Sequence, residues 1–253
     1  MIESILQRPP NTAPRRVLVA GASGGIGQAF CLQLVAQFPT IGLIRLARNT
    51  VKLLPLSVPT QDIAFDITDA ARITNALQAL PDKANIDWVF IATGWLHDDS
   101  MQPEKTWRSV EADHLLRSYT VNAIGPALLV KHLLAKLNPG HPTTIGILSA
   151  RVGSISDNQI GGWHSYRASK AALNMLIKNF AIELKRMKRP TIVVGLQPGT
   201  TETALSEPFK RNVPPDHLQT PEFTASHLLQ VMQCLRADDS GQLFDFSGFW
   251  FAP

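Results

Sequence analysis

Short apolar runs alternate along the chain with longer stretches whose apolar residues recur at three- and four-residue spacing. The short runs predict buried strands at 17–21, 41–47, 86–93, 145–150, 192–197 and 242–248. The longer stretches predict amphipathic helices near 26–38, 69–80, 104–136, 165–188 and 221–236. Because strands and helices alternate, we expect an α/β fold in which helices cover both faces of a parallel sheet.

Two segments depart from this alternation. Residues 1–16 contain three prolines and two adjacent arginines, a composition that favours an extended N-terminal arm over a packed element. Residues 198–221 contain several prolines and predict a long loop after a strand, where loops are often functional. We therefore expect a single domain over 17–253, with a functional loop at about 200–223.

The composition limits the class of protein. With 253 residues, 45% of them hydrophobic and 17% charged, the chain has the composition of a soluble globular protein. We expect a cytoplasmic protein that binds no membrane, because no apolar run reaches roughly 18 residues and the start lacks signal-peptide order. Cys31 and Cys234 are too few for a disulfide framework or a structural metal site. The 24 basic and 20 acidic residues are scattered, which argues against a nucleic-acid partner.

A glycine-rich turn follows the first predicted strand. Gly21, Gly25 and Gly27 stand between this strand and the next helix, and Ser23 is one of the small residues that fill the turn. Glycines let the backbone approach a pyrophosphate, whose charge is favoured at the N-terminus of a helix. The alternative is an ordinary strand-to-helix turn. The strand before it and the helix after it are the context that dinucleotide binding requires, so we expect such a site here.

The second predicted strand ends beside Arg48. A carboxylate at this position usually binds the 2′-hydroxyl of an adenosine, whereas an arginine binds a 2′-phosphate. No acidic residue lies between Pro39 and Gln61. The sequence therefore favours NADP(H), with NAD(H) as the other possibility. The alternative for Arg48 is a solvated side chain at the end of a strand.

Tyr166 and Lys170 stand four residues apart in a predicted helix, and this spacing places both on one face. A phenol is a poor acid or base at neutral pH, but a neighbouring ammonium group favours the phenolate and lowers the pKa of the phenol. The pair is therefore a candidate acid–base group. The alternative, a surface tyrosine with an incidental lysine, loses weight because the glycine turn stands upstream in the same chain.

Together these motifs resemble those of the short-chain dehydrogenase/reductase family. The resemblance covers roughly residues 17–250 and rests on Gly21, Gly25-Ile26-Gly27, Asp66-Ile67-Thr68, Asn122, Tyr166, Lys170 and Pro198-Gly199, in this order. It implies a Rossmann-type, doubly wound and mostly parallel seven-stranded sheet in one dinucleotide-binding catalytic domain. It also implies a nicotinamide cofactor, hydride exchange with a small-molecule carbonyl or alcohol, and assembly into a homodimer or homotetramer. The stretch 148–174 further resembles C-factor-like proteins of the family, which are linked to cell-to-cell signalling.

The resemblance assigns a role to each matching residue. Tyr166 is the expected general acid or base, and Lys170 is expected to hold the nicotinamide ribose and to lower the pKa of the tyrosine. Asn122 is expected to kink its helix and to position a water molecule. Asp66 and Ile67 are expected near the adenine. The other expected cofactor contacts are Gly21, Ser23, Gly25, Ile26, Gly27, Arg48, Ala92, Thr93, Gly94, Pro198, Gly199, Thr201 and Thr203.

Two positions depart from the family pattern. The segment Ile91-Ala92-Thr93-Gly94 stands where the family commonly has Asn-Asn-Ala-Gly, although main-chain contacts could persist there. The catalytic serine of the family aligns with Ala150, which leaves Ser149, one residue earlier, and Ser154, just after Gly153, as candidates to hold the substrate oxygen. Because a shift of one residue along a strand turns a side chain to the opposite face, the third possibility is that no serine does so.

Three functions follow from these observations. The first is an NADP(H)-preferring oxidoreductase in which Tyr166 supplies the proton. The second is a catalytically weak dinucleotide-binding regulatory or signalling protein on the same fold. A nucleotide-sugar epimerase or dehydratase is favoured least, because no sizeable C-terminal sugar domain follows. The segment His97-Asp98-Asp99 indicates a solvated loop more than a metal site, and Trp163 and His164 either line the substrate pocket or pack.

Overall fold

The computed structural model describes residues 3–212, 214 and 217–253. Residues 1–2 of the predicted arm and residues 213 and 215–216 of the predicted loop lie outside this part of the chain. Within it, seven parallel strands form one sheet in the order β3-β2-β1-β4-β5-β6-β9, which confirms the predicted doubly wound Rossmann-type fold. The strands are Arg16–Ala20 (β1), Gly42–Ala47 (β2), Thr60–Ala64 (β3), Trp88–Ile91 (β4), Thr143–Leu148 (β5), Thr191–Gln197 (β6) and Leu243–Asp245 (β9).

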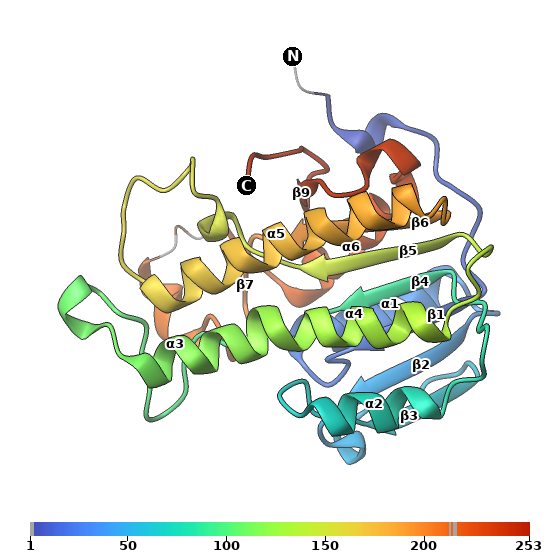
Figure 1. The fold of residues 1–253 in the computed structure, drawn as a ribbon, viewed down its shortest axis with the longest axis horizontal. Helices are drawn as coiled ribbons and strands as arrows, with labels where there is room; N and C mark the ends of the chain where they lie inside the picture. The colour runs from blue at the N-terminus through green and yellow to red at the C-terminus, as the bar shows by residue number, and fades with distance from the viewer. Residues whose placement is uncertain (1–2, 213, 215–216) are drawn as a thin grey trace.

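Helices cover both faces of the sheet, with α4 and α5 in front of it in the view of Figure 1. Successive strand residues point to opposite faces, so Val17 and Leu18 belong to different cores. Leu18 packs in the core built with α2, α4 and α5, and Val17 in the core built with α1 and α6. The helices are Gly25–Gln37 (α1), Ala70–Gln78 (α2), Ala112–Tyr119 (α3), Gly125–Lys136 (α4), His164–Arg186 (α5) and Pro221–Cys234 (α6). Among the described residues, no helix combines the length and apolar character needed to cross a bilayer.

The structure corrects two of the predicted elements. The sheet contains a strand, β3, that the apolar pattern missed, because it forms the edge of the sheet and its residues are mostly exposed. The predicted helix over 104–136 is wrong at its start. Residues 107–109 form a separate short turn whose Trp107 is 70% exposed, and the regular helix begins at Ala112. A π-helical segment, Thr120–Ile124, then joins α3 to α4.

The loop predicted over 198–221 contains short elements of its own. Two residue pairs, Thr200–Thr201 (β7) and Leu218–Gln219 (β8), form a small parallel ladder. A 3-10 helix, Glu207–Asn212, lies between them. The segment therefore folds back on itself beside the carboxyl end of β6.

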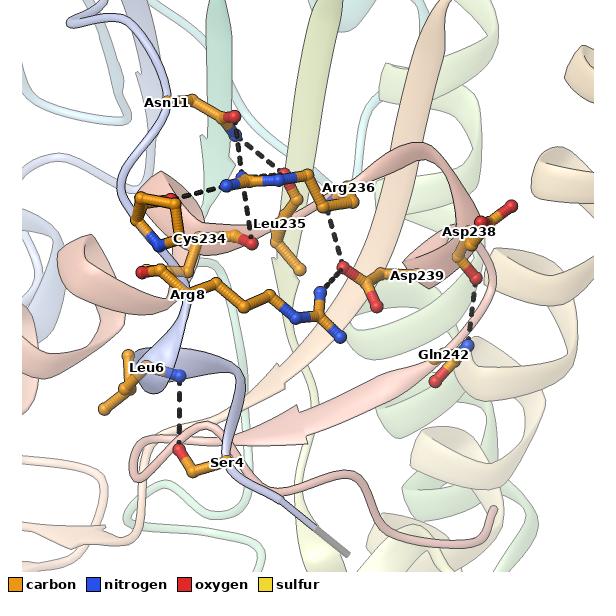
Figure 2. Close-up of polar contacts among 11 residues, drawn as sticks. Ser4, Leu6, Arg8, Asn11, Cys234, Leu235, Arg236, Asp238, Asp239 and Gln242 are labelled. Carbon is orange, nitrogen blue, oxygen red and sulfur yellow. Dashed lines mark hydrogen bonds and ion pairs between the residues drawn. The ribbon is translucent and has the colours of Figure 1, made fainter.

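The N-terminal arm is packed against the body of the protein, contrary to the prediction of an extended arm without packing. Ile5 lies in a short 3-10 turn and is 3% exposed, in the same core as α1 and α6. Figure 2 shows the Asp239 carboxylate between two donors, the Arg8 guanidinium and the Arg236 backbone N–H, whose nitrogen atoms lie 2.6 and 2.7 Å from the same oxygen. The side chain of Asn11 donates to the carbonyl of Leu235. These contacts supply the packing that the proline-rich composition did not reveal.

Candidate active site

The segments that follow β1, β4, β5 and β6 surround a cavity of about 630 Å³ at the carboxyl edge of the sheet. This is the edge at which ligands bind in open parallel sheets. Among the sequence-predicted residues, those that line the cavity are Gly25, Ile26, Arg48, Ala92, Thr93, Gly94, Ser149, Tyr166, Lys170, Pro198, Gly199, Thr201 and Thr203. The chain therefore brings most of the predicted cofactor residues and the Tyr–Lys pair to one place. The predicted site residues outside this lining are Gly21, Ser23, Gly27, Asp66, Ile67, Asn122 and Ser154.

The glycine turn is built by close backbone approach. Gly21 has a φ of +80°, a conformation that favours glycine, and a side chain at Gly27 would come within 2.2 Å of the Gly21 carbonyl oxygen. A side chain at Gly25 would come within 2.7 Å of Thr203, which belongs to the loop after β6. Ser23 lies in the same turn and is partly exposed. The turn therefore presents bare backbone and the N-terminus of α1 to the cavity, as a phosphate site requires.

Two charged residues stand at the neighbouring strand ends. Arg48 follows β2 and is exposed at the cavity wall, and Asp66 follows β3. Partial burial acts to raise the pKa of Asp66, but hydrogen bonds from Thr68 and the charges of Arg48 and Arg72 hold it below its usual value. Ile67 is buried, and its carbonyl lies against Gly125 at the start of α4.

Tyr166 and Lys170 lie on one face of α5, as their spacing predicts. The Lys170 Nζ atom is 5.7 Å from the centroid of the Tyr166 ring and donates a hydrogen bond of 2.9 Å to the Leu148 carbonyl, at the end of β5. Burial raises the pKa of Tyr166 to about 12 and lowers that of Lys170 to about 8. Burial is the cause of the rise in the Tyr166 pKa, and the lowering of this pKa by Lys170 stays a prediction.

Asn122 lies in the π-helical segment and joins three parts of the site. Its Oδ1 accepts a hydrogen bond of 2.8 Å from the Trp95 backbone N–H, and its Nδ2 donates to the Trp95 carbonyl at the same distance. Nδ2 also donates to Ser169 Oγ at 3.0 Å, and the Ser169 hydroxyl donates to the Tyr166 carbonyl. The irregular helix around Asn122 thus connects the loop after β4 to the first turns of α5.

The three positions considered for the family serine have different surroundings. The Ser149 hydroxyl donates a hydrogen bond of 2.6 Å to Asn174 Oδ1, and Ser149 is buried. Ser154 is buried beside a separate hollow of about 150 Å³, where its hydroxyl accepts from the Asp157 backbone. Ala150 contributes only a methyl group to the lining of the main cavity.

An aromatic wall of His97, Trp163 and Phe209 stands beside Tyr166. The Trp163 ring lies 5.0 Å from the Phe209 ring and 6.2 Å from the Tyr166 ring, and His97 lies 5.6 Å from Phe209. The sequence predicts that His97 lies in a solvated loop, but the structure places it in the lining of the cavity. Its Nε2 is 3.0 Å from the Leu205 carbonyl oxygen. From the sequence, Trp163 is a candidate to line the substrate pocket or to pack, and Phe209 lies in the predicted functional loop without a role of its own. The described residues contain no cluster of three or more His, Cys, Asp or Glu suited to a metal ion.

Comparison with known proteins places these features in context. The model of the short chain dehydrogenase family matches residues 15–214. A 1-hydroxy-2-glutathionyl-2-methyl-3-butene dehydrogenase from Rhodococcus sp. (strain AD45) is 30% identical over 228 residues, which are 89% of this chain and 94% of that protein. The C-signal protein of Myxococcus xanthus is 30% identical over 139 residues, which are 55% of this chain and 78% of that protein.

The fold is also similar to that of solved structures. An NADPH-bound carbonyl reductase from chicken fatty liver has a TM-score of 0.77 and 23% identity, with 94% of this chain and 99% of that chain covered. A short-chain dehydrogenase/reductase from Burkholderia multivorans with bound NADP has a TM-score of 0.75 and 24% identity, with 97% and 100% covered. At these identities the likeness concerns the fold.

Proposed function

Since the chain belongs to the short chain dehydrogenase family, a family of oxidoreductases, we propose that it is an NADP(H)-preferring enzyme that acts on a small-molecule carbonyl or alcohol. The observation that carries this proposal is that the glycine turn, Arg48, Tyr166 and Lys170 line the same cavity. The NADPH and NADP in the titles of the two structural neighbours support the choice of cofactor.

The residues present fit a nicotinamide dinucleotide. Gly25 leaves the N-terminus of α1 open to a pyrophosphate at the cavity lining, and Gly27 lets α1 pack closely on the Gly21 carbonyl behind it. Thr93 offers a buried hydroxyl oxygen at the cavity lining, and it has no hydrogen-bond partner among the described residues. Arg48 would hold the 2′-phosphate, and Lys170 would hold the nicotinamide ribose.

Tyr166 is the residue proposed to transfer the proton, and its hydroxyl must carry that proton before the reaction. When bound, the nicotinamide supplies the hydride that reaches the carbonyl carbon. The Tyr166 hydroxyl is protonated at neutral pH, as any phenol is, and this is the form that donates a proton to the substrate oxygen. Burial raises the pKa of Tyr166 to about 12, which makes the hydroxyl a weaker acid. Asn122 and Ser169 hold the Tyr166 backbone in place during this transfer.

The aromatic wall indicates the kind of substrate. His97, Trp163 and Phe209 are each only partly buried, so their rings present accessible apolar area to the cavity. A carbonyl compound with an apolar or aromatic substituent fits this wall better than a sugar, whose hydroxyl groups would lose hydrogen bonds to water without replacement. The substrate carbonyl would then lie between this wall and Tyr166.

A second candidate function is a catalytically weak dinucleotide-binding regulatory or signalling protein. The observation that favours it is the absence of a serine hydroxyl at Ala150, with Ser149 bonded to Asn174 instead. The similarity to the C-signal protein of Myxococcus xanthus fits this candidate loosely. The loss of one positioned donor slows a reaction by about 10² to 10³-fold, which leaves room for weak turnover.

We also propose that the protein assembles into a homodimer or homotetramer through α4 and α5. Met175 and Ile182 stand seven residues apart on α5 and are 62% and 47% exposed, and Ile124 at the start of α4 is 49% exposed. Apolar side chains grouped on one helix face mark a protein interface.

Replacement of Tyr166 by Phe is expected to abolish carbonyl-dependent oxidation of NADPH, because the phenyl ring has no proton to donate. NADPH binding, followed by nicotinamide fluorescence, is expected to stay within about twofold, since the ring itself is kept. Tyr119→Phe is the matched control, because Tyr119 is the other tyrosine of the chain and lies on α3. Unchanged turnover in Tyr166→Phe would exclude Tyr166 as the proton donor.

Replacement of Arg48 by Ala is expected to weaken NADPH binding by roughly 10- to 100-fold. This loss of affinity corresponds to the free energy of one hydrogen bond between charged groups. The affinity for NADH, which lacks the 2′-phosphate, is expected to change little. Arg72→Ala is the control, because Arg72 also acts on Asp66 but does not line the cavity. Titration of both nucleotides decides the point: equal losses for NADPH and NADH would contradict a 2′-phosphate role.

Replacement of Ala150 by Ser is expected to raise kcat for carbonyl reduction by at least about tenfold, because it adds a hydroxyl donor at the cavity wall. Ala150→Cys is the matched control, since its thiol has similar reach but is a weak donor. Steady-state kinetics on one ketone compare the three proteins. If the unsubstituted protein binds NADPH without turnover and Ala150→Ser turns over, the regulatory candidate is the correct one.

Replacement of Met175 by Lys is expected to dissociate the oligomer, because it places a charge in the apolar contact. Light scattering on a sizing column measures the mass of each variant. Val51→Lys is the control, since Val51 is 91% exposed and lies after β2, away from α5. A monomeric unsubstituted protein would contradict the proposed assembly.

A further inference from the structure

The first turn of α5, which carries Tyr166, starts from an unusual backbone. Gly161, Gly162 and Trp163 have φ values of +69°, +65° and +49°, so three successive residues lie in the left-handed region. Trp163 is the residue that caps α5, and its indole offers no oxygen to the N–H groups of the first turn. These groups therefore need an acceptor from elsewhere in the chain.

Glu104 supplies this acceptor from 61 residues upstream. Its two carboxylate oxygens lie 3.3 and 3.2 Å from the Ser165 backbone nitrogen, whose N–H they accept, and one of them also accepts from the Ser165 hydroxyl. The Glu104 carbonyl accepts a hydrogen bond of 2.5 Å from the Trp163 N–H. Glu104 thus holds the turn through both its side chain and its backbone, and it is only 2% exposed.

The charge of Glu104 suits this place. A helix N-terminus carries a partial positive charge, and His114 Nδ1 on α3 lies 3.3 Å from the carboxylate. Burial alone would raise the pKa of Glu104, but the hydrogen bonds from Ser165 and the charge of His114 hold it below its usual value. The group is therefore an ionised carboxylate kept inside the protein by three polar groups on two helices, the Ser165 N–H, the Ser165 hydroxyl and His114 Nδ1.

The residues on either side of this contact belong to the active site. Ser165 directly precedes Tyr166, and Trp163 is part of the aromatic wall. The His114 ring stacks edge-on against Trp95 at 5.1 Å, and Trp95 is the residue whose backbone Asn122 holds. Figure 1 shows α3 beside the N-terminal end of α5, and these two helices pack on each other.

We propose that Glu104 is a positioning residue for the reaction, which fixes the first turn of α5 and thereby sets the place of Tyr166 and Trp163 in the cavity. The inference rests on the proposed oxidoreductase function. A displacement of about 1 Å at a reacting group can cost 10²-fold in rate, so a loosened first turn affects the proton transfer directly. The glycine turn and Arg48 lie on other strand ends and are independent of this contact.

The test compares Glu104→Ala, Glu104→Gln and the control Glu111→Gln, which makes the same chemical change at an exposed residue before α3. In Glu104→Ala, kcat is expected to fall roughly 10- to 100-fold, while the affinity for NADPH stays within about twofold. Glu104→Gln keeps an acceptor oxygen for Ser165 and is expected to restore part of kcat. Glu111→Gln is expected to match the unsubstituted protein.

A general loss of folded protein would mimic this result, so a second variant and a second measurement are included. Ser165→Ala removes one donor to the carboxylate and leaves the charge and the backbone contact, and its kcat is expected to fall in the same direction by a smaller factor. Hydrogen exchange, measured without substrate, is expected to accelerate over 163–167 in Glu104→Ala and to stay unchanged in β1 and β4.

The outcomes separate this proposal from the proposed function. Unchanged kcat in Glu104→Ala, or a loss that merely follows the folded fraction or NADPH affinity, overturns the positioning role. Absence of turnover in the unsubstituted protein contradicts the proposed enzyme. In that case hydrogen exchange in Glu104→Ala still tests whether Glu104 fixes the first turn of α5. Faster exchange confined to 163–167 supports this contact, and unchanged exchange there overturns it.

Discussion

The common direction of the strands is the constraint on which the rest of this structure depends. Because the seven strands of the described sheet are parallel, the segments after β1, β4, β5 and β6 leave it at one edge. The order of the strands reverses between β1 and β4, so the following segments diverge there and leave a crevice. A glycine turn, an arginine at a strand end and a tyrosine on a later helix meet at this edge although they are far apart in the sequence.

Burial is the second constraint, and it acts mainly on α5. Lys170 and Glu104 are both 2% exposed, and a charge inside a protein is costly unless hydrogen bonds replace its water. Lys170 meets this need at the Leu148 carbonyl, and Glu104 meets it at Ser165 and His114. Each contact also ties α5 to another element. The helix is therefore held on both sides of Tyr166, and burial raises the pKa of Tyr166.

The sequence predicts those parts of the fold that leave a local pattern. Strands buried on both faces are continuous apolar runs, and such runs predict β1, β2, β4, β5 and β6. The edge strand β3 begins with Thr60, Gln61 and Asp62 and leaves no such run. The apolar periodicity of α3 and α4 extends through the π-helical segment between them, but it does not reveal that the chain before Ala112 is not regular helix.

In the site too, the sequence predicts the features that have a local pattern and misses those that depend on distant contacts. The glycine turn and the Tyr–Lys pair have fixed spacings within one segment, and such spacings can be read locally. His97 and Glu104 contact Leu205 and Ser165, which are 108 and 61 residues away, and neither pair has a local signature. The shift in the Tyr166 pKa also depends on how deeply the ring is buried, a property of the folded chain. Sequence spacing therefore places Tyr166 and Lys170 on one face of α5, but it does not reveal the effect of burial on the Tyr166 pKa.

The cavity has two parts of different construction. The groups expected to hold the cofactor and move the proton lie at strand ends and on the long helix α5, whose positions are fixed by the sheet. The aromatic wall comes from three separate segments, around His97, Trp163 and Phe209, and such connecting segments vary more readily than the elements they join. The position of Ala150 belongs to the first part, because it directly follows β5 and Ser149 is bonded to α5. A change of substrate can therefore arise at His97 or Phe209 without disturbing Tyr166, whereas Trp163 is tied to Tyr166 through the first turn of α5 and Ala150 faces every substrate alike.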